Sequence, residues 1–370
     1  MVEIICRSTV YFGSLSFFDK EVKSIGEDRF QDFLELVRRY DAYKSKDDLH
    51  GLLEDNLIIR NDANFGITNE AHGHLGGLIE SITTEDASIY IHNPTNRLFQ
   101  YLKENEGNQK IKLSIKNEGY RMLEDETEFY KCQLALNEHI KGQTHAIQEI
   151  SKSLWYLIKV QRKKPYVIML YGKSGLGKTE MVREIANSFF DGKLMEKHLS
   201  MFKNEAQASY FFGEKATDRS LGYDLLARQS NLVFFDELDK CPEYFYSAFY
   251  TLFDNEIFKD SIYDVDISNL IIFITSNYES EQEMRKKLGD PIYYRIDKFI
   301  HFKEFSHATI NELLKKEIES RKSEFEKYLS MDEVYNAAIK IIKVKDENGR
   351  TIKLKVQKVI EDCLYDQLKE

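Results

Sequence analysis

The chain has 370 residues, of which 42% are hydrophobic and 13% aromatic, so it is long enough for two or three domains and its composition excludes a disordered protein. The net charge of −10 is uneven, because residues 1–130 hold 24 acidic against 15 basic side chains, which disfavours nucleic acid as a partner of this region. We expect a cytoplasmic protein without a membrane span, since there is no run of eighteen apolar residues, no secretory leader and no metal or redox spacing among Cys6, Cys132, Cys241 and Cys363.

Residues 1–130 are predicted to form a mixed α+β accessory domain. Helical spacing relates Phe30, Phe33, Leu34 and Val37, whereas the segments ASIYIHNP and QKIKLSIKNEGY alternate as strands do. The region resembles no family that we recognise. We expect it to bind a protein partner.

Residues 131–305 show a different pattern, in which strands alternate with helices. Two helices separated by a short break are followed by the apolar strand PYVIMLY, a glycine-rich loop and a helix. Two further buried strands are NLVFFDELD and NLIIFITSN. This alternation predicts an α/β domain with a parallel sheet flanked by helices. Residues 306–370 are predicted to form a small helical lid.

The glycine-rich loop has the G-x-x-x-x-G-K-T spacing of a phosphate-binding loop. Its glycines let backbone N–H groups surround phosphates, and the helix that follows directs its N-terminal dipole at them. Lys178 is predicted to bind the outer phosphates of ATP, and the Thr179 hydroxyl to bind Mg²⁺. The predicted nucleotide-binding residues of this segment are Gly172, Lys173, Ser174, Gly175, Leu176, Gly177, Lys178, Thr179 and Glu180.

Polar side chains follow the two other buried strands, where ligands bind in parallel sheets. Asp236 is predicted to hold Mg²⁺, and Glu237 to act as the base that polarises an attacking water. Asn277 is predicted to hold that water near the γ-phosphate. Taken singly, two acids or one asparagine at a strand end are ordinary surface or turn residues; it is the phosphate loop that favours the catalytic interpretation.

These three strand ends together resemble the AAA+ ATPases, and the resemblance covers residues 135–370. IKGQTHAI is similar to the segment that contacts adenine, which implies that role for Gly142 and Gln143. LGDPIYYRIDKFIHF is similar to the Clp-family stretch with the arginine finger, here Arg295. NGRTIKLKVQKVIEDCL resembles the lid helix of the second ClpA and ClpB ATPase module, which implies a sensor arginine at Arg350. Either arginine could instead be a surface residue in a salt bridge.

The resemblance implies a P-loop AAA+ fold and an ATPase that assembles into a homo-oligomeric ring or arc, with a hexamer as one candidate. It also implies that Mg-ATP turnover across subunit interfaces remodels a partner or the assembly itself. The G-Y-V-G loop, whose aromatic side chain grips polypeptide in Clp-type unfoldases, is shortened here and continues from Gly213 as EKATDR. A nucleotide-gated switch or scaffold, with no threaded substrate, is therefore the alternative. A nucleic-acid clamp is disfavoured by charge, and a GTPase by the lack of an N-K-x-D motif.

Overall fold

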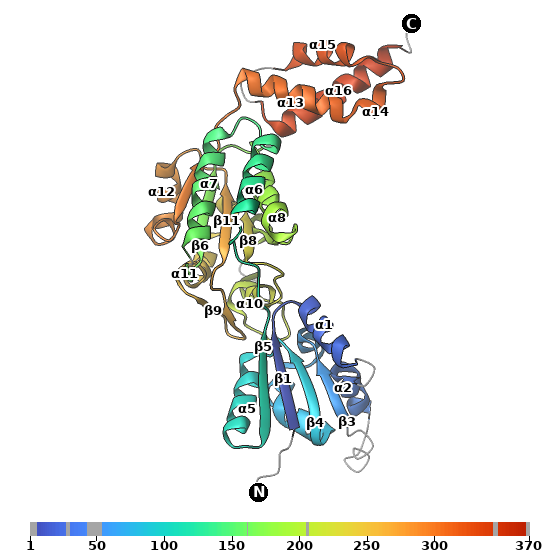
Figure 1. Ribbon diagram of the computed structural model, residues 1–370, viewed down its shortest axis with the longest axis vertical. Coiled ribbons are helices and arrows are strands. Elements are labelled where there is room, and N and C mark those ends of the chain that lie inside the picture. The colour runs from blue at the N-terminus through green and yellow to red at the C-terminus, as the bar shows by residue number, and fades with distance from the viewer. Residues whose placement is uncertain are drawn as a thin grey trace.

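Three parts of the chain follow one another along the long axis of the molecule (Figure 1). The computed structural model describes residues 6–26, 30–42, 54–160, 162–204, 207–342 and 347–367. We call residues 6–117 the N-terminal domain, residues 126–301 the central domain and residues 305–367 the lid. The central domain lies between the other two, so the lid and the N-terminal domain occupy its opposite ends.

The N-terminal domain is a parallel sheet with helices between its strands. Its strand order is β2-β3-β4-β1-β5, and every pairing is parallel. The buried apolar positions of β1, β3 and β4 pack against the helices in one core. Its elements are β1 (Cys6–Phe12), α1 (Leu15–Ile25), β2 (Gln31–Asp32), α2 (Phe33–Ala42), β3 (Glu54–Ile59), the 3₁₀ helix η3 (Asn61–Gly66), α3 (Asn69–Gly73), α4 (Leu75–Ile82), β4 (Thr83–His92), α5 (Asn96–Gly107) and β5 (Ile111–Asn117).

The arrangement of the N-terminal domain corrects the sequence-based expectation in one respect. The expected helix near Phe33 and the strands before Asn93 and Asn117 are present as α2, β4 and β5. The domain is nevertheless α/β rather than α+β, because helices alternate with strands that all run in parallel. The first strand, β1, lies inside the sheet between two partners that are distant in sequence, and alternation within single segments carries no information about such pairing.

The central domain is the predicted parallel sheet flanked by helices. Its strand order is β12-β6-β11-β8-β7, again with parallel pairing throughout. Every residue of β11 is buried, as are five of the six residues of β6, because helices cover both faces. The elements are α6 (Glu126–His139), α7 (Thr144–Lys159), β6 (Tyr166–Tyr171), α8 (Lys178–Phe190), β7 (Met195–His198), η4 (Leu199–Met201), α9 (Ala208–Phe212), α10 (Leu221–Leu226), β8 (Leu232–Asp236), η6 (Leu238–Lys240), η7 (Glu243–Phe245), α11 (Tyr246–Asp254), β9 (Ile257–Lys259), β10 (Asp264–Asp266), β11 (Ile271–Ser276), α12 (Glu281–Tyr293) and β12 (Lys298–His301).

Helix α6 belongs to the central domain. Its buried side chains Phe129, Cys132 and Leu136 share a core with α7 and α8. The chain therefore leaves the N-terminal domain after β5, before residue 126, whereas the sequence suggested a division at residue 130. Asp125 caps this helix, and Glu126 and Glu128 lie in its first turn, a pattern typical of a helix start that the division at residue 130 overlooked.

The lid is a helical unit with a core of its own. Its elements are α13 (His307–Ser320), α14 (Lys322–Phe325), α15 (Met331–Ile341) and α16 (Gly349–Asp366). Buried side chains of α13, α15 and α16 form a separate cluster around Leu314, Val334 and Val356. Such a unit can shift against the central domain without disturbing either core.

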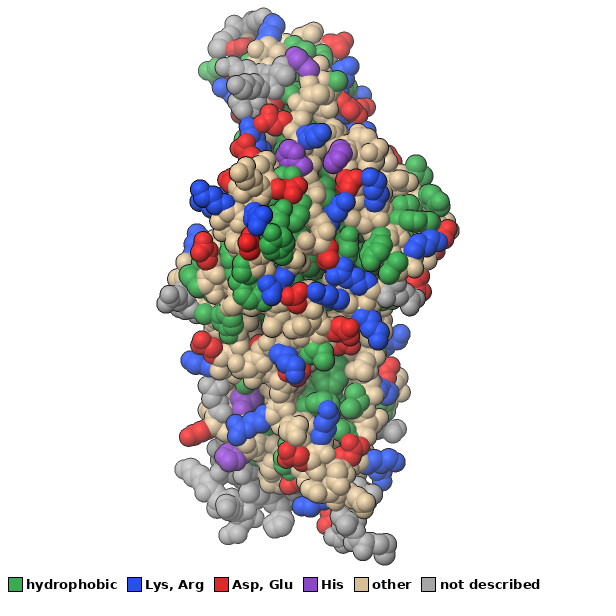
Figure 2. Space-filling view, turned by 90° about the vertical axis from the view of Figure 1, so that its left-hand side faces the viewer, with side chains coloured by type: hydrophobic (Ala, Val, Ile, Leu, Met, Phe, Trp, Pro, Cys, Tyr) green, Lys and Arg blue, Asp and Glu red, His purple; other side chains and the backbone are tan. Residues whose placement is uncertain are grey.

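On the face shown in Figure 2, acidic and basic side chains are intermixed along the length of the molecule. None of the described helices combines the length and the apolar character that crossing a bilayer requires.

Candidate functional site

The phosphate loop, residues 172–177, connects β6 to α8 and owes its shape to glycine. Gly172, Gly175 and Gly177 have φ values of 131°, 77° and 96°, a region that side-chain-bearing residues rarely adopt. A Cβ atom at Gly172 would lie 2.4 Å from the carbonyl oxygen of Phe302. The loop conformation therefore depends on these glycines, as the sequence pattern predicted.

Lys178 begins α8 and is buried in the loop that precedes it. Its Nζ donates hydrogen bonds to the carbonyl oxygens of Gly172 at 2.5 Å and Lys173 at 2.8 Å. Burial lowers the pKa of Lys178 to about 8, although the neighbouring carboxylates of Asp239 and Asp236 oppose the shift. A phosphate group beside Nζ would stabilise the positive charge of Lys178 and so oppose the effect of burial on its pKa.

Two helix N-termini meet at the loop. Helix α8 begins directly after Gly177, and α16 of the lid begins after its cap residue Asn348. The backbone N–H of Gly349 donates to the carbonyl of Gly175 at 2.9 Å, which fixes the start of α16 against the loop. Two helix dipoles thus present positive ends to one place, which suits a polyanion.

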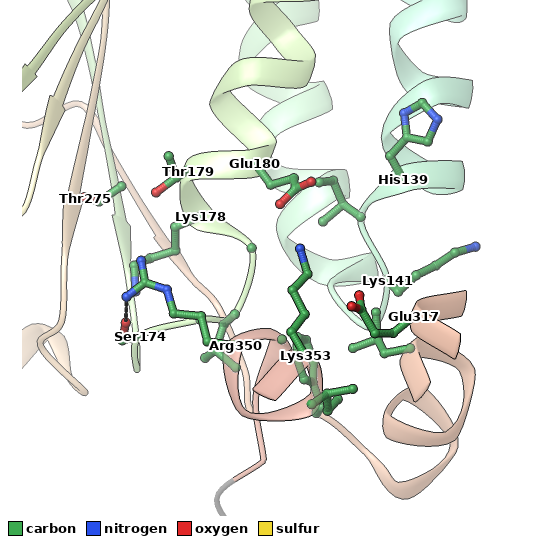
Figure 3. Close-up of a pocket in the computed structure, with 18 of the residues that line it drawn as sticks. His139, Lys141, Ser174, Lys178, Thr179, Glu180, Thr275, Glu317, Arg350 and Lys353 are labelled. Carbon is green, nitrogen blue, oxygen red and sulfur yellow. Dashed lines mark hydrogen bonds between the residues drawn. The ribbon is translucent and has the colours of Figure 1, made fainter. Parts of the chain in front are cut away.

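Arg350 extends this contact between the lid and the loop. Its Nη1 donates to the Ser174 hydroxyl at 3.2 Å, and Figure 3 shows the side chain reaching across from α16. Arg350 thus lies beside the phosphate loop, where the resemblance of its helix to the ClpA and ClpB lid helix leads one to expect a sensor arginine. Lys353 lies one turn further along α16 and lines the same cavity.

The carboxyl ends of β8 and β11 bring the predicted acids together. The Thr275 hydroxyl donates to the Asp236 carboxylate and accepts a hydrogen bond from the backbone N–H of Glu237 at 2.9 Å. Glu237 has a φ of 62°, a costly conformation for a residue other than glycine. One buried threonine therefore positions both acids, and it stabilises the strained backbone of the second.

Asn277 follows β11 and faces Lys178. Its Oδ1 lies 3.4 Å from the lysine Nζ, and its backbone N–H donates to the Asp239 carboxylate at 3.0 Å. The structure thus brings together Asn277, the phosphate loop and the acids of β8. The hydrogen bond to Asp239 holds the backbone of Asn277 in place.

These groups line one cavity of about 490 Å³ between the central domain and the lid. Its polar wall includes Ser174, Thr179, Asp236, Glu237 and Asn277. The lid adds Arg350 and Lys353, which Figure 3 shows facing Ser174, Thr179 and Glu180 across the cavity. The remaining wall is partly apolar, a surface on which a planar base can pack. Its apolar members are Ile140, Leu176, Phe305, Leu313 and Ile352.

Gly142 and Gln143, expected to contact adenine, lie behind this wall. The buried Gln143 amide donates to the carbonyl oxygens of Leu176 and Lys303 at 3.3 Å and 2.8 Å. Among the described residues, their neighbours His139, Ile140 and Lys141 line the cavity instead. Gln143 thus connects the phosphate loop to the segment between β12 and the lid. Any effect of Gln143 on a bound base would therefore act through the residues that line the cavity.

The cavity fits a nucleoside triphosphate with Mg²⁺. The loop N–H groups, Lys178, Ser174 and Arg350 can hold phosphates, while Thr179 and Asp236 supply the hydroxyl and carboxylate oxygens that Mg²⁺ prefers. Mg²⁺ bound there would neutralise phosphate charge.

Arg295, the expected arginine finger, lies outside this cavity. It follows α12, and its guanidinium forms an ion pair with Asp254 at the end of α11. Its Nη1 also donates to the Pro291 carbonyl at 2.6 Å, and the guanidinium lies 4.6 Å from the Tyr250 ring centroid. Within one chain Arg295 is therefore engaged in a salt bridge, and a role on nucleotide would require a neighbouring subunit.

The aromatic side chains beside the shortened loop are packed. Phe211 is buried in the central core, and Tyr210 stacks on Phe202. The Tyr210 hydroxyl donates to the buried Asp224 carboxylate at 2.7 Å. A role in gripping polypeptide would require both aromatic rings to leave these contacts.

Sequence reasoning missed several residues of the site. Thr275 and Asp239 stand inside the motifs ITSN and FFDELD, but only the strand register shows that they contact Asp236, Glu237 and Asn277. His198 ends β7 and its Nδ1 lies 3.4 Å from Asp236. No spacing pattern could reveal His198, because α9, α10 and most of β8 separate it from Asp236 along the chain.

A family model described as the AAA domain (Cdc48 subfamily) matches residues 163–329, which span the phosphate loop, both acidic and polar strand ends and the start of the lid. The central domain and lid form a ClpA/ClpB-like AAA+ module. AAA+ modules in general bind nucleotide and are ATPases.

Relatives support the same assignment of the AAA+ module. The chaperone protein ClpB of Mycoplasmoides gallisepticum is 24% identical over 206 residues, covering 49% of this chain and 28% of ClpB. ClpB of Clostridium perfringens is 23% identical over 236 residues, covering 60% and 27%. ClpB of Yersinia enterocolitica is 29% identical over 161 residues, covering 40% and 18%. The similarity thus spans about a quarter or less of each ClpB chain.

A solved structure shares the fold of the AAA+ module and extends beyond it. A closed-state reconstruction of Hsp104 with ATPγS and FITC-casein superposes with a TM-score of 0.55 at 13% identity, covering 98% of this chain and 87% of that one. The P-loop AAA+ fold expected from the sequence is thereby confirmed.

Proposed function

We propose that this protein binds and hydrolyses ATP with Mg²⁺, and that hydrolysis is completed across the interface between identical subunits in a ring or arc. The observation that carries the proposal is the single cavity that joins Lys178, Asp236, Glu237 and Asn277 to Arg350 of the lid. Turnover would remodel a bound protein partner, recruited through the N-terminal domain, or the assembly itself.

The residues of the cavity have separable roles in this proposal. Lys178 and the loop N–H groups bind phosphates, and Asp236 with Thr179 holds Mg²⁺. Glu237 accepts a proton from the attacking water, and Asn277 holds that water. Arg350 reports phosphate occupancy to the lid, because its helix already contacts the loop through Gly349.

Arg295 supplies the argument for action across an interface. It lies outside the cavity of its own chain, where it donates hydrogen bonds to the Asp254 carboxylate and the Pro291 carbonyl. A guanidinium beside the γ-phosphate of a neighbour would stabilise charge that develops during phosphoryl transfer, an effect worth roughly 10³–10⁵ in rate. Binding to the neighbour would have to replace the Asp254 ion pair.

The experiment that tests the proposal mixes two inactive variants. Arg295→Ala keeps an intact cavity but lacks the finger, whereas Glu237→Gln keeps the finger but lacks the base. We expect each alone to hydrolyse ATP slowly and mixtures to recover part of the wild-type rate. Recovery is expected because some interfaces then join an intact cavity to an intact finger.

Arg285→Ala is the matched control for this experiment. Arg285 lies on α12, just before Arg295 in the chain, is exposed and is paired with Asp290, so its removal should leave the rate unchanged. Absence of recovery in mixtures shown to co-assemble would contradict action across subunits.

A second candidate function is a nucleotide-gated oligomeric switch in which no substrate is threaded. The packing of Tyr210 and Phe211 favours it, since neither ring is free to hold a polypeptide. The two functions differ in whether ATP turnover is stimulated by an added protein substrate.

A further inference from the structure

The N-terminal domain and the central domain have the same strand order. Numbered along the chain within each sheet, both read 5-1-4-3-2, with parallel pairing throughout. The order differs from the 3-2-1-4-5 and 2-1-3-4-5 orders of common doubly wound sheets. No sequence repeat signals this duplication.

Equivalent backbone hydrogen bonds at the strand ends allow the residues of the two sheets to be matched one to one. The N–H of Phe302 after β12 donates to the carbonyl of Tyr171 at the end of β6, and the N–H of Glu118 after β5 donates to Phe12 at the end of β1, each at 2.8 Å. The glycines that follow, Gly172 and Gly13, both have positive φ, 131° and 148°. A Cβ on either glycine would collide with the residue just after the fifth strand.

This register shows which residues of the N-terminal domain stand where the catalytic groups of the central domain lie. Ile59 of β3 and Phe235 of β8 pair with equivalent residues of the fourth strands, so Arg60 corresponds to Asp236 and Asn61 to Glu237. A cation thus replaces the acid that would hold Mg²⁺, and an amide replaces the base.

The phosphate loop is missing from the N-terminal domain. Only Gly13 and Ser14 separate β1 from α1, where residues 172–177 separate β6 from α8. Helix α1 begins with Leu15 at the position of Lys178. The charge that would contact phosphates is therefore absent as well.

A side chain of the domain itself occupies the position of the phosphates. The Glu118 carboxylate accepts hydrogen bonds from the backbone N–H of Ser14 at 2.5 Å and from its hydroxyl at 3.0 Å. Asn93, at the end of β4, accepts from the N–H of Gly13 and donates to its carbonyl. The start of α1 thus bonds to a carboxylate of its own domain, which offsets the positive end of the helix dipole.

The same edge of this sheet contacts the central domain. Asn61 accepts a hydrogen bond from the Tyr263 hydroxyl at 2.9 Å. The Asn96 N–H donates to the Ile262 carbonyl at 2.8 Å, while its side-chain oxygen accepts from the N–H of Asp264 at 2.9 Å. These contacts reach the segment that joins β9 to β10.

Aromatic rings and a carboxylate extend the contact to the shortened loop. Phe65 lies 5.2 Å, centroid to centroid, from Tyr223 of α10. Asp260 accepts hydrogen bonds from the Ser220 hydroxyl at 2.8 Å and from the Tyr263 N–H at 2.7 Å. The β9–β10 segment thus connects the N-terminal domain to residues 208–226. Figure 1 shows α10 and β9 at this junction.

We propose that the N-terminal domain is a nucleotide-free counterpart of the central domain, and that the sheet edge at which a nucleotide would bind instead clamps residues 208–226 and 257–266. The domain binds no nucleotide and holds the shortened loop in its packed conformation. The clamp does not depend on ATP hydrolysis by the central domain.

The clamp is tested by hydrogen–deuterium exchange on the full chain. Asn61→Ala removes the acceptor of the Tyr263 hydroxyl, and we expect amide exchange in residues 208–226 and 257–266 to rise about tenfold. Asn108→Ala is the matched control, because Asn108 is exposed at the end of α5 and should change exchange in neither segment.

Tyr263→Phe removes the donor of the same hydrogen bond, the Tyr263 hydroxyl, and keeps the aromatic ring. It should raise exchange in η3 and in residues 257–266 even if Asn61→Ala fails to fold. Unchanged exchange in Tyr263→Phe would overturn the clamp.

The nucleotide-free assignment is tested with a fluorescent ATP analogue and the Lys178→Ala full chain. We expect one saturable site per unmodified chain and a lower affinity at that site in this variant. A second site per chain, with an affinity that Lys178→Ala leaves unchanged, would overturn the inference. Failure of the unmodified chain to bind the analogue would instead contradict the proposed function and leave the N-terminal domain assignment standing.

Discussion

At the scale of single residues, the candidate site depends on a few side chains that hold others in position. Thr275 is buried, donates to Asp236 and accepts from the Glu237 N–H. Glu237 has a left-handed backbone conformation that this hydrogen bond helps to maintain. In the proposed function, nucleotide binding and hydrolysis rely on different groups, which substitutions can separate.

Lys178→Ala and Glu237→Gln should fail in different ways. Lys178→Ala should weaken ATP binding, because the buried cation beside the phosphates is lost. Glu237→Gln should bind Mg-ATP as the unmodified chain does and hydrolyse it about a hundredfold to ten-thousandfold more slowly, since only the base is removed. Equilibrium binding of a labelled nucleotide and a phosphate-release assay measure the two effects. Wild-type hydrolysis by both variants would contradict the site.

Thr275→Val should lower turnover more than ATP affinity. The substitution keeps the shape of the side chain but leaves the Glu237 N–H without its acceptor, at a cost of about 1–3 kcal/mol in the free energy of unfolding. Thr275→Ser, which keeps the hydroxyl, should restore most of the rate. Steady-state kinetics and chemical denaturation distinguish the outcomes, and equal rates for valine and serine would exclude this role.

At the scale of elements, one carboxylate connects the start of α10 to the β9–β10 pair. Asp260, between β9 and β10, accepts from the Ser220 hydroxyl and the N–H groups of Gly222, Ile262 and Tyr263. The β9–β10 pair and the start of α10 therefore move together. This connection explains why a loop of hydrated residues is nevertheless fixed in position.

Asp260→Ala should release this segment. Loss of four hydrogen bonds to one charged group should lower the free energy of unfolding by about 3 kcal/mol. It should also speed tryptic cleavage after Lys215 and Arg219. Asp218→Asn is the matched control, because Asp218 is exposed in the same loop and should leave both measurements unchanged. Equal cleavage rates for the two variants would show that Asp260 does not hold the loop.

At the scale of the whole molecule, the three parts form a series from lid to N-terminal domain (Figure 1). The nucleotide cavity lies between lid and central domain, whereas the clamp lies at the opposite end of the central domain. Motion of the lid can therefore change the nucleotide cavity while the shortened loop stays packed. This arrangement favours limited remodelling over processive threading of a polypeptide.

A folded fluorescent protein with an unstructured tail should keep its fluorescence in the presence of this protein, ATP and a trap for unfolded chains. The reason is that Phe211 is buried and Tyr210 is bonded to Asp224, so neither presents an apolar grip. The sample must hydrolyse ATP and bind the tail for the comparison to count. ATP-dependent loss of fluorescence that Tyr210→Ala abolishes would restore the unfoldase interpretation.

The sequence by itself determined the parts of the site that are local along the chain. A glycine-rich loop between an apolar strand and a helix can be recognised because Gly172, Gly177 and Lys178 stand at fixed spacing within one turn of backbone. Apolar strands that end in Asp236 and Asn277 are equally local, and parallel strands place their carboxyl ends at one edge. These motifs also follow one another along the chain in the order found in the AAA+ family.

Only the tertiary structure decided which residues support the site and what the N-terminal domain is. Thr275 and His198 contact Asp236, and Asp239 contacts Asn277, through strand register, a relation between segments that no spacing encodes. The N-terminal sheet has β1 between β4 and β5, so its order is set by burial of strands distant in sequence. The two sheets thus share an order of buried strands without sharing the loop or the charges, because packing tolerates many apolar sequences and phosphate chemistry tolerates few.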